Sequence, residues 1–139
     1  MQKRLIQKEE KIAETINSLR EESARGTLIL VEGKKDVEAL RNLGVEGPVS
    51  TVKTGGKSFL DVISELEKAE VSEVALLLDF DRRGRQGTNR LKHSLESVGI
   101  KANLEFWKAL AASVGKDLQC VEGLTGYLKN LRAKIGAPV

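Results

Sequence analysis

The sequence predicts an α/β domain in which a parallel four-stranded sheet is flanked by helices, with an extra helix at each terminus. Short apolar runs alternate with helical stretches after Gly26, in the order strand, helix, strand, helix, strand, helix, strand. The length of 139 residues is that of one domain. With 40% hydrophobic and 31% charged residues, the composition fits an aliphatic core under a charged surface.

Residues 1–25 are predicted to form an amphipathic helix that ends before Gly26. Its apolar stripe is interrupted by Glu9 and consists of Leu5, Ile12, Ile16 and Leu19. One interpretation is a helix packed on the flank of the domain. The other is an arm that forms a homodimer or binds a protein partner.

The four predicted strands cover residues 27–31, 49–52, 74–78 and 102–106. The first and third are continuous apolar runs, which is typical of strands covered on both faces. Between the strands, apolar residues recur at helical spacing, as Val37, Leu40 and Leu43, then Phe59, Val62, Ile63 and Leu66, then Leu91, Leu95 and Val98.

The tail is predicted to be helical. Its apolar stripe consists of Val121, Leu124, Leu128, Leu131 and Ile135, and Gly123 and Gly126 weaken the pattern from within. The expected organisation is therefore a helix over 1–25, a domain over 26–110 and a helical extension over 111–139 packed on that domain.

Several classes of protein are excluded or disfavoured. Cys120 is the single cysteine and His93 the single histidine, so an intramolecular disulfide is impossible and a zinc site is disfavoured. The charged amino terminus lacks the apolar core of a secretory signal, and no run of apolar residues is long enough to span a membrane. A cytoplasmic protein without membrane contact is expected.

Acidic residues follow two of the predicted strands. Glu32 ends the first strand, and Asp79 and Asp81 end the third. Ligands of open parallel sheets bind at the carboxyl ends of the strands, so these acids are expected to cluster. Clustered carboxylates suit Mg²⁺ or Mn²⁺, as one ion or two. The alternative is that Asp79 and Asp81 cap the next helix and Glu32 pairs with a lysine.

Basic residues and glycines lie at the same predicted edge. The segment from Thr54 to Ser58 ends like a P-loop, but Thr51 stands where that motif needs a glycine. We expect a phosphate-contacting loop instead, or an ordinary turn. The residues expected to contact phosphate are Lys34, Lys35, Gly55, Gly56, Lys57, Arg82, Arg83 and Arg85.

The charge is polarised along the sequence. The whole chain has a net charge of only +3. Segments 32–36, 53–57 and 79–92 together hold nine basic and four acidic residues, a net charge of +5, which leaves −2 for the rest. The predicted site edge is therefore cationic on a mildly acidic body, as a protein that binds a polyanion requires.

Two motifs, LILVEGKKDVEAL and VALLLDFDRRG, carry a family resemblance. A strand ending in Glu-Gly followed by a strand ending in Asp-x-Asp resembles the Toprim domain of bacterial primases, topoisomerases, nucleases and small ribosomal-RNA maturases. The resemblance covers about residues 27–110 and is closest to small stand-alone archaeal Toprim proteins. It implies a Rossmann-like sheet and assigns functions to five residues: Glu32 as general acid or base and metal contact, Asp79 and Asp81 as Mg²⁺ ligands, and Gly33 and Gly84 as turn glycines.

The family includes enzymes that cleave, rejoin and synthesise phosphodiester bonds. Tyr127 is the single tyrosine, which argues against a topoisomerase, and the length and cysteine count argue against a full primase. The first hypothesis is therefore a Mg²⁺-dependent nuclease or nucleotidyl transferase acting on RNA or DNA. The alternative is a non-catalytic module that binds metal and nucleic acid and positions substrate for a partner. A receiver-like domain ranks last, because only one acid follows the first strand.

Overall fold

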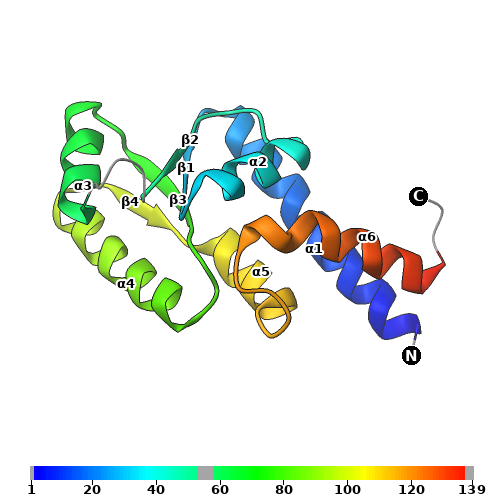
Figure 1. Ribbon diagram of the computed structural model, residues 1–139. Helices are drawn as coiled ribbons and strands as arrows, with labels where there is room; N and C mark the ends of the chain where they lie inside the picture. Colours follow the sequence, from blue (N-terminus) through cyan, green and yellow to red (C-terminus); the bar gives the residue numbers. More distant parts are fainter. Residues whose placement is uncertain (1, 53–57, 137–139) are drawn as a thin grey trace.

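A computed structural model describes residues 2–52 and 58–136. These residues contain a four-stranded, all-parallel sheet in the order β2-β1-β3-β4 (Figure 1). The strands are β1 (Leu28–Val31), β2 (Val49–Thr51), β3 (Glu73–Leu77) and β4 (Lys101–Asn103). The predicted fold class is confirmed. No helix in this part of the chain combines the length and apolar character needed to cross a membrane.

The strand order reverses direction next to β1. From β1 the chain passes to β2 on one side and then to β3 on the other. Val31 at the end of β1 pairs with Leu77 at the end of β3 and with Thr51 at the end of β2. The loops after β1 and β3 therefore leave the sheet side by side at a topological switch point, where open α/β sheets bind ligands.

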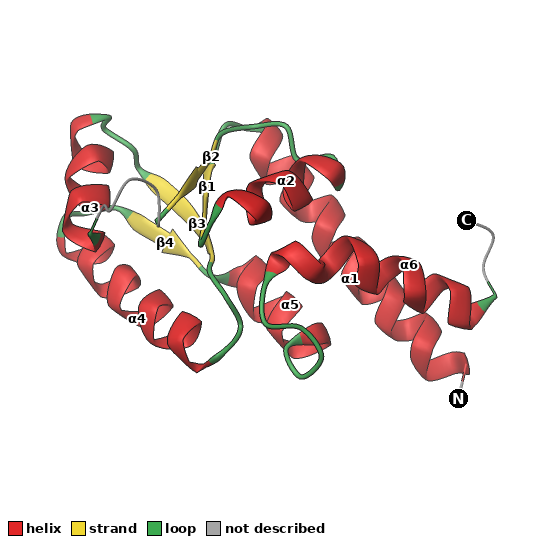
Figure 2. Ribbon diagram, viewed as in Figure 1, coloured by secondary structure: helices red, strands yellow, loops and turns green. Residues whose placement is uncertain are grey.

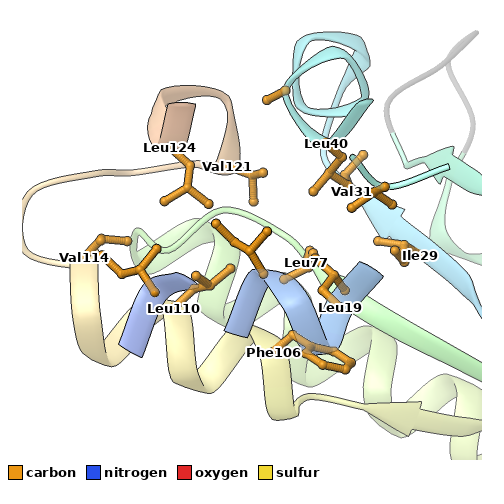
Figure 3. Packing of buried hydrophobic residues seen from close by; sticks show 14 of the residues in the cluster. Leu19, Ile29, Val31, Leu40, Leu77, Phe106, Leu110, Val114, Val121 and Leu124 are labelled. Carbon is orange, nitrogen blue, oxygen red and sulfur yellow. The ribbon is translucent and has the colours of Figure 1, made fainter. Parts of the chain in front are cut away.

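Helices cover both faces of the sheet (Figure 2). On one face, α3 (Phe59–Lys68) and α4 (Arg82–Ser97) pack over Leu30, Val74 and Leu76. The other face, with Ile29, Val31, Ala75 and Leu77, packs against the remaining helices, which are α1 (Gln2–Ala24), α2 (Lys34–Asn42), α5 (Glu105–Val114) and α6 (Leu124–Ile135) (Figure 3). This alternation explains the continuous apolar runs of the strands, since both faces are buried.

The N-terminal helix α1 packs on the flank of the domain. Ile12, Ile16 and Leu19 from its apolar stripe are buried in the larger core cluster with residues of α5 and α6. Glu9, which interrupts the stripe, accepts a hydrogen bond from Arg132 Nε of α6 at 3.1 Å. Glu9 therefore interrupts the apolar stripe at a position where α1 forms an ion pair with α6.

The prediction of a fourth strand over residues 102–106 was wrong beyond Asn103. The chain turns there into helix α5, so Phe106 and Trp107 lie on a helix. Asn103 is nearly buried; its Nδ2 donates to Glu73 Oε2 at 3.1 Å, and its Oδ1 accepts from Glu105 N–H at 3.0 Å. The Asn103 side chain thus satisfies an N–H of the first turn of α5 that no backbone carbonyl within the helix could reach.

The helical tail is also divided differently from the prediction. Val121 belongs to a short 3₁₀ segment, Val121–Gly123, and α6 begins at Leu124. Gly123 therefore precedes the helix and only Gly126 lies inside it.

The first turn of α4 packs directly on the backbone of Asp79. A Cβ atom at Gly84 would lie 2.0 Å from the Asp79 carbonyl oxygen and 2.4 Å from its carbonyl carbon. The Gly84 N–H donates to Asp81 Oδ1 at 2.8 Å, which caps the helix. Glycine is required here by close approach of two backbone segments.

We predict that Gly84→Ala lowers the free energy of unfolding by about 1–3 kcal/mol, because the new methyl group overlaps a backbone carbonyl. The matched control is Gly87→Ala in the same helix, where a Cβ would meet the Phe59 ring at 3.4 Å. That change should stabilise the protein by up to about 1 kcal/mol through helix propensity. Urea unfolding measures both; equal effects of the two substitutions would contradict the packing described.

Candidate functional site

The loops after β1 and β3 meet in a hydrogen bond. The backbone N–H of Asp79 donates to Glu32 Oε2 at 3.2 Å. The two loops border an open pocket of about 270 Å³, lined by Glu32, Gly33, Lys34, Lys35, Asp36, Asp79, Cys120 and Glu122. The structure therefore brings Glu32 and Asp79 together at the carboxyl edge of the sheet, as the sequence predicted.

Asp36 is an acid of this pocket that the sequence analysis did not single out. It lies in the first turn of α2 and its side chain is buried. Its Oδ2 accepts from Gly33 N–H at 3.1 Å, and its Oδ1 accepts from Glu122 N–H at 2.9 Å. These two backbone donors fix the carboxylate and satisfy an N–H at the start of α2.

Asp36, Asp79 and Cys120 form a group that could hold a metal ion. Their ligand atoms all lie within 4.8 Å of one another. Burial raises the pKa of the Cys120 thiol, and the charges of Asp36 and Asp79 raise it further. Sulfur is a soft donor and carboxylate oxygen a hard one, so the two carboxylates are the better ligands for a hard cation. Such hard oxygen donors suit Mg²⁺, which binds through one or two carboxylates and retains several waters.

Asp81 has a different position. It is the N-cap of α4, and its Oδ1 accepts the hydrogen bond from Gly84. Among the described residues, the converging group of three possible ligands does not include it. For Asp81 the structure thus shows the helix-capping arrangement that the sequence analysis held as its alternative.

The predicted phosphate-binding residues fall into three groups. Lys34 and Lys35 line the pocket at the start of α2, and Lys35 Nζ lies 4.0 Å from Glu122 Oε1. Arg82 and Arg83 are exposed in the first turn of α4, whereas Arg85 Nε donates to the Phe80 carbonyl at 3.2 Å and so braces the loop. Residues Gly55, Gly56 and Lys57 lie outside the described part of the chain.

The two predicted turn glycines differ. Gly84 is required by its contact with Asp79, as described above. Gly33 has an extended backbone with φ −147°, and a Cβ built on it would meet nothing within 4 Å. Its geometry does not demand a glycine. Gly33 contributes its backbone N–H, which donates to Asp36 Oδ2.

Sequence reasoning missed Asp36, Cys120 and Glu122. Asp36 had a local signal, since an acid in the first turn of a helix commonly bonds back to the cap residue. Cys120 and Glu122 had no such local signal, because they reach the pocket from a segment more than 80 residues after Asp36.

Comparison with known proteins identifies the fold family. The model of the Toprim domain matches residues 26–104. A UPF0292 protein of Methanosarcina barkeri is 37% identical, covering 91% of this chain and 87% of the relative. A UPF0292 protein of Methanocaldococcus jannaschii is also 37% identical, covering 86% and 91%. A solved structure, a putative protein from Aquifex aeolicus, is 31% identical with a TM-score of 0.65, covering 78% of this chain and 94% of that one.

The matched segment holds more than half of the chain and contains both motifs. Glu32 and Gly33 lie in the first motif, and Asp79, Asp81 and Gly84 lie in the second. The resemblance to archaeal Toprim proteins is confirmed by relatives that match along most of their own length. The chain therefore belongs to the Toprim domain family.

Proposed function

We propose that this protein is a Mg²⁺-dependent enzyme that cleaves phosphodiester bonds in RNA or DNA. Membership of the Toprim family supports metal-dependent chemistry on nucleic acid. The observation that carries the proposal is the convergence of Glu32, Asp36 and Asp79 on one pocket at the switch point of the sheet, with exposed cations beside it.

Asp36 and Asp79 would hold the metal ion. The Asp36 carboxylate is already oriented by the N–H groups of Gly33 and Glu122, so it needs little rearrangement to bind. A bound Mg²⁺ or Mn²⁺ neutralises phosphate charge and lowers the pKa of coordinated water.

Glu32 would transfer the proton. Its Oε2 accepts the Asp79 N–H, and the residue lines the pocket between the two loops. From there it acts as general base toward the attacking water or general acid toward the leaving oxygen. The roles of the three acids are therefore separate: two hold the metal and one moves the proton.

The substrate backbone would be bound by the cations around the pocket. Lys34 and Lys35 line it, and Arg82 and Arg83 extend from the first turn of α4. Both α2 and α4 begin at this edge, and the dipole of a helix favours negative charge near its N-terminus. Such contacts read the backbone and carry no base specificity.

A second function is favoured by the position of Asp81. Because this acid caps α4 outside the converging group, the site would hold metal with fewer carboxylates than the Asp-x-Asp motif offers. On this hypothesis the protein binds metal and nucleic acid and positions the substrate for a partner enzyme. Turnover of pure protein distinguishes the two functions.

We predict that Glu32→Gln lowers the cleavage rate by about 10²–10⁴-fold, because the proton-transfer group is lost. The assay incubates labelled single- and double-stranded RNA and DNA with Mg²⁺, Mn²⁺ or EDTA. The control is Glu38→Gln, an exposed glutamate on α2 that should leave the rate unchanged. Metal-independent cleavage, or equal product from wild type and Glu32→Gln, would refute the catalytic assignment.

We predict that Arg82→Ala/Arg83→Ala weakens nucleic-acid binding and reduces the salt dependence of the binding constant. Each lost phosphate contact should lower the slope of log K against log salt by about 0.9 for a duplex. The control is Lys3→Ala/Arg4→Ala, which removes the same charge from exposed residues of α1. Equal slopes for both double variants would show that the arginines do not touch phosphate.

A further inference from the structure

The loop that carries Asp79 leaves the sheet and must find hydrogen-bond partners elsewhere. Strand β3 ends at Leu77, so the peptide groups that follow have no partner in a strand ladder. The Leu78 carbonyl accepts from Trp107 Nε1 at 2.9 Å. The Phe80 N–H donates to the Gln119 carbonyl at 2.6 Å. Both partners lie outside the matched Toprim segment, 26–104.

One peptide plane is held at both ends. The carbonyl of Leu78 and the N–H of Asp79 belong to the same planar peptide unit. Trp107 holds its oxygen, and Glu32 holds its N–H at 3.2 Å. Rotation of this plane about the axis through the Cα atoms of Leu78 and Asp79 would break both contacts. The orientation of the peptide group that leads into Asp79 is therefore held by the Glu32 carboxylate on one side and by the indole of α5 on the other.

The same C-terminal region also fixes the second acid. We call residues 119–122 the bridging segment. It is part of the connection between α5 and α6, which is orange in Figure 1. At one end, Gln119 accepts the hydrogen bond from Phe80; at the other, the Glu122 N–H donates to Asp36 Oδ1 at 2.9 Å. Cys120 lies between them in the pocket. The bridging segment thus spans from the Asp79 loop to Asp36.

Side-chain packing supports these hydrogen bonds. Leu78 and Phe80 are both about 1% exposed, and they belong to different core clusters on the two faces of the sheet. Asp79 therefore sits between two anchored residues. The hydrogen bonds from Trp107 and to the bridging segment add to this anchoring: they fix the peptide groups on either side of Asp79 and, through Glu122, the carboxylate of Asp36.

We propose that Trp107 and the bridging segment are positioning elements that set the spacing of Asp36 and Asp79 for metal binding. The inference rests on the proposed function, which takes these two acids as metal ligands. Its physical basis is that the side chains of metal and catalytic sites must be held within about 0.5 Å of the geometry in which they bind or react. The C-terminal extension is then part of the site, although the family model ends before it.

The test is Trp107→Phe in the full chain, which keeps an aromatic ring and deletes the N–H donor. The matched control is Tyr127→Phe, which deletes a donor to Asp117 away from the pocket. Amide hydrogen exchange of the metal-free protein, followed by NMR, should show about tenfold faster exchange at Asp79 in Trp107→Phe. The amides of Ala75 and Leu76 in β3 report whether the sheet remains folded.

Metal affinity is the second measurement. Titration with Mn²⁺, followed by electron paramagnetic resonance of the free ion, should show an affinity about 3–10-fold weaker in Trp107→Phe and unchanged in Tyr127→Phe. Faster exchange at Asp79 together with weaker Mn²⁺ binding supports the proposal.

Three results would overturn it. The first is exchange at Asp79 that stays at the wild-type rate, and the second is exchange that accelerates equally at Asp79, Ala75 and Leu76. The third is wild-type Mn²⁺ affinity in Trp107→Phe despite faster exchange at Asp79. Failure of the wild-type protein to bind Mn²⁺ is distinguishable from these, because it overturns the proposed function and the metal-positioning role together.

Discussion

The parallel pairing of β1 with β3 is the constraint on which the rest of the structure depends. It places Val31 opposite Leu77, so the two chain segments that leave the sheet next, beginning at Glu32 and Leu78, emerge side by side. Because β2 lies on the far side of β1, this edge is the switch point of the sheet. The acidic pocket is a consequence of this strand order. So is the need for new hydrogen-bond partners beyond Leu77, which Trp107 of α5 and Gln119 of the bridging segment supply.

Gathering acids at one edge has an electrostatic cost, and the structure offsets it with backbone donors. Asp36 accepts two N–H groups and Glu32 accepts one. Lys34 and Lys35 add positive charge at the rim. Asp36 and Glu32 are therefore oriented before any ligand arrives, which is the condition for a preorganised site. Burial raises the pKa of the Cys120 thiol, and the charges of Asp36 and Asp79 raise it further.

The sequence predicted the features that depend on local pattern and on strand order. Alternating apolar runs gave the parallel sheet, and the acids following two of those runs gave Glu32 and Asp79 as neighbours. Asp81 takes the capping position that the sequence also allowed, because the Gly84 N–H lies three residues further along and donates to its Oδ1. The start of α5 was missed because Asn103, whose Oδ1 accepts the Glu105 N–H, is itself held by Glu73, a residue thirty positions earlier. Cys120, Glu122 and Trp107 join the site through long-range packing, which no local periodicity encodes.

The central claim is that Asp36 and Asp79, beside Glu32, form a site for a divalent cation. Anomalous diffraction from crystals soaked in Mn²⁺ tests it most directly, since the ion itself is located without reference to any reaction. The account predicts an anomalous peak within coordination distance of carboxylate oxygens of both Asp36 and Asp79. A well-ordered pocket without a peak, or an ion bound by Asp81 and not by Asp36, would contradict it.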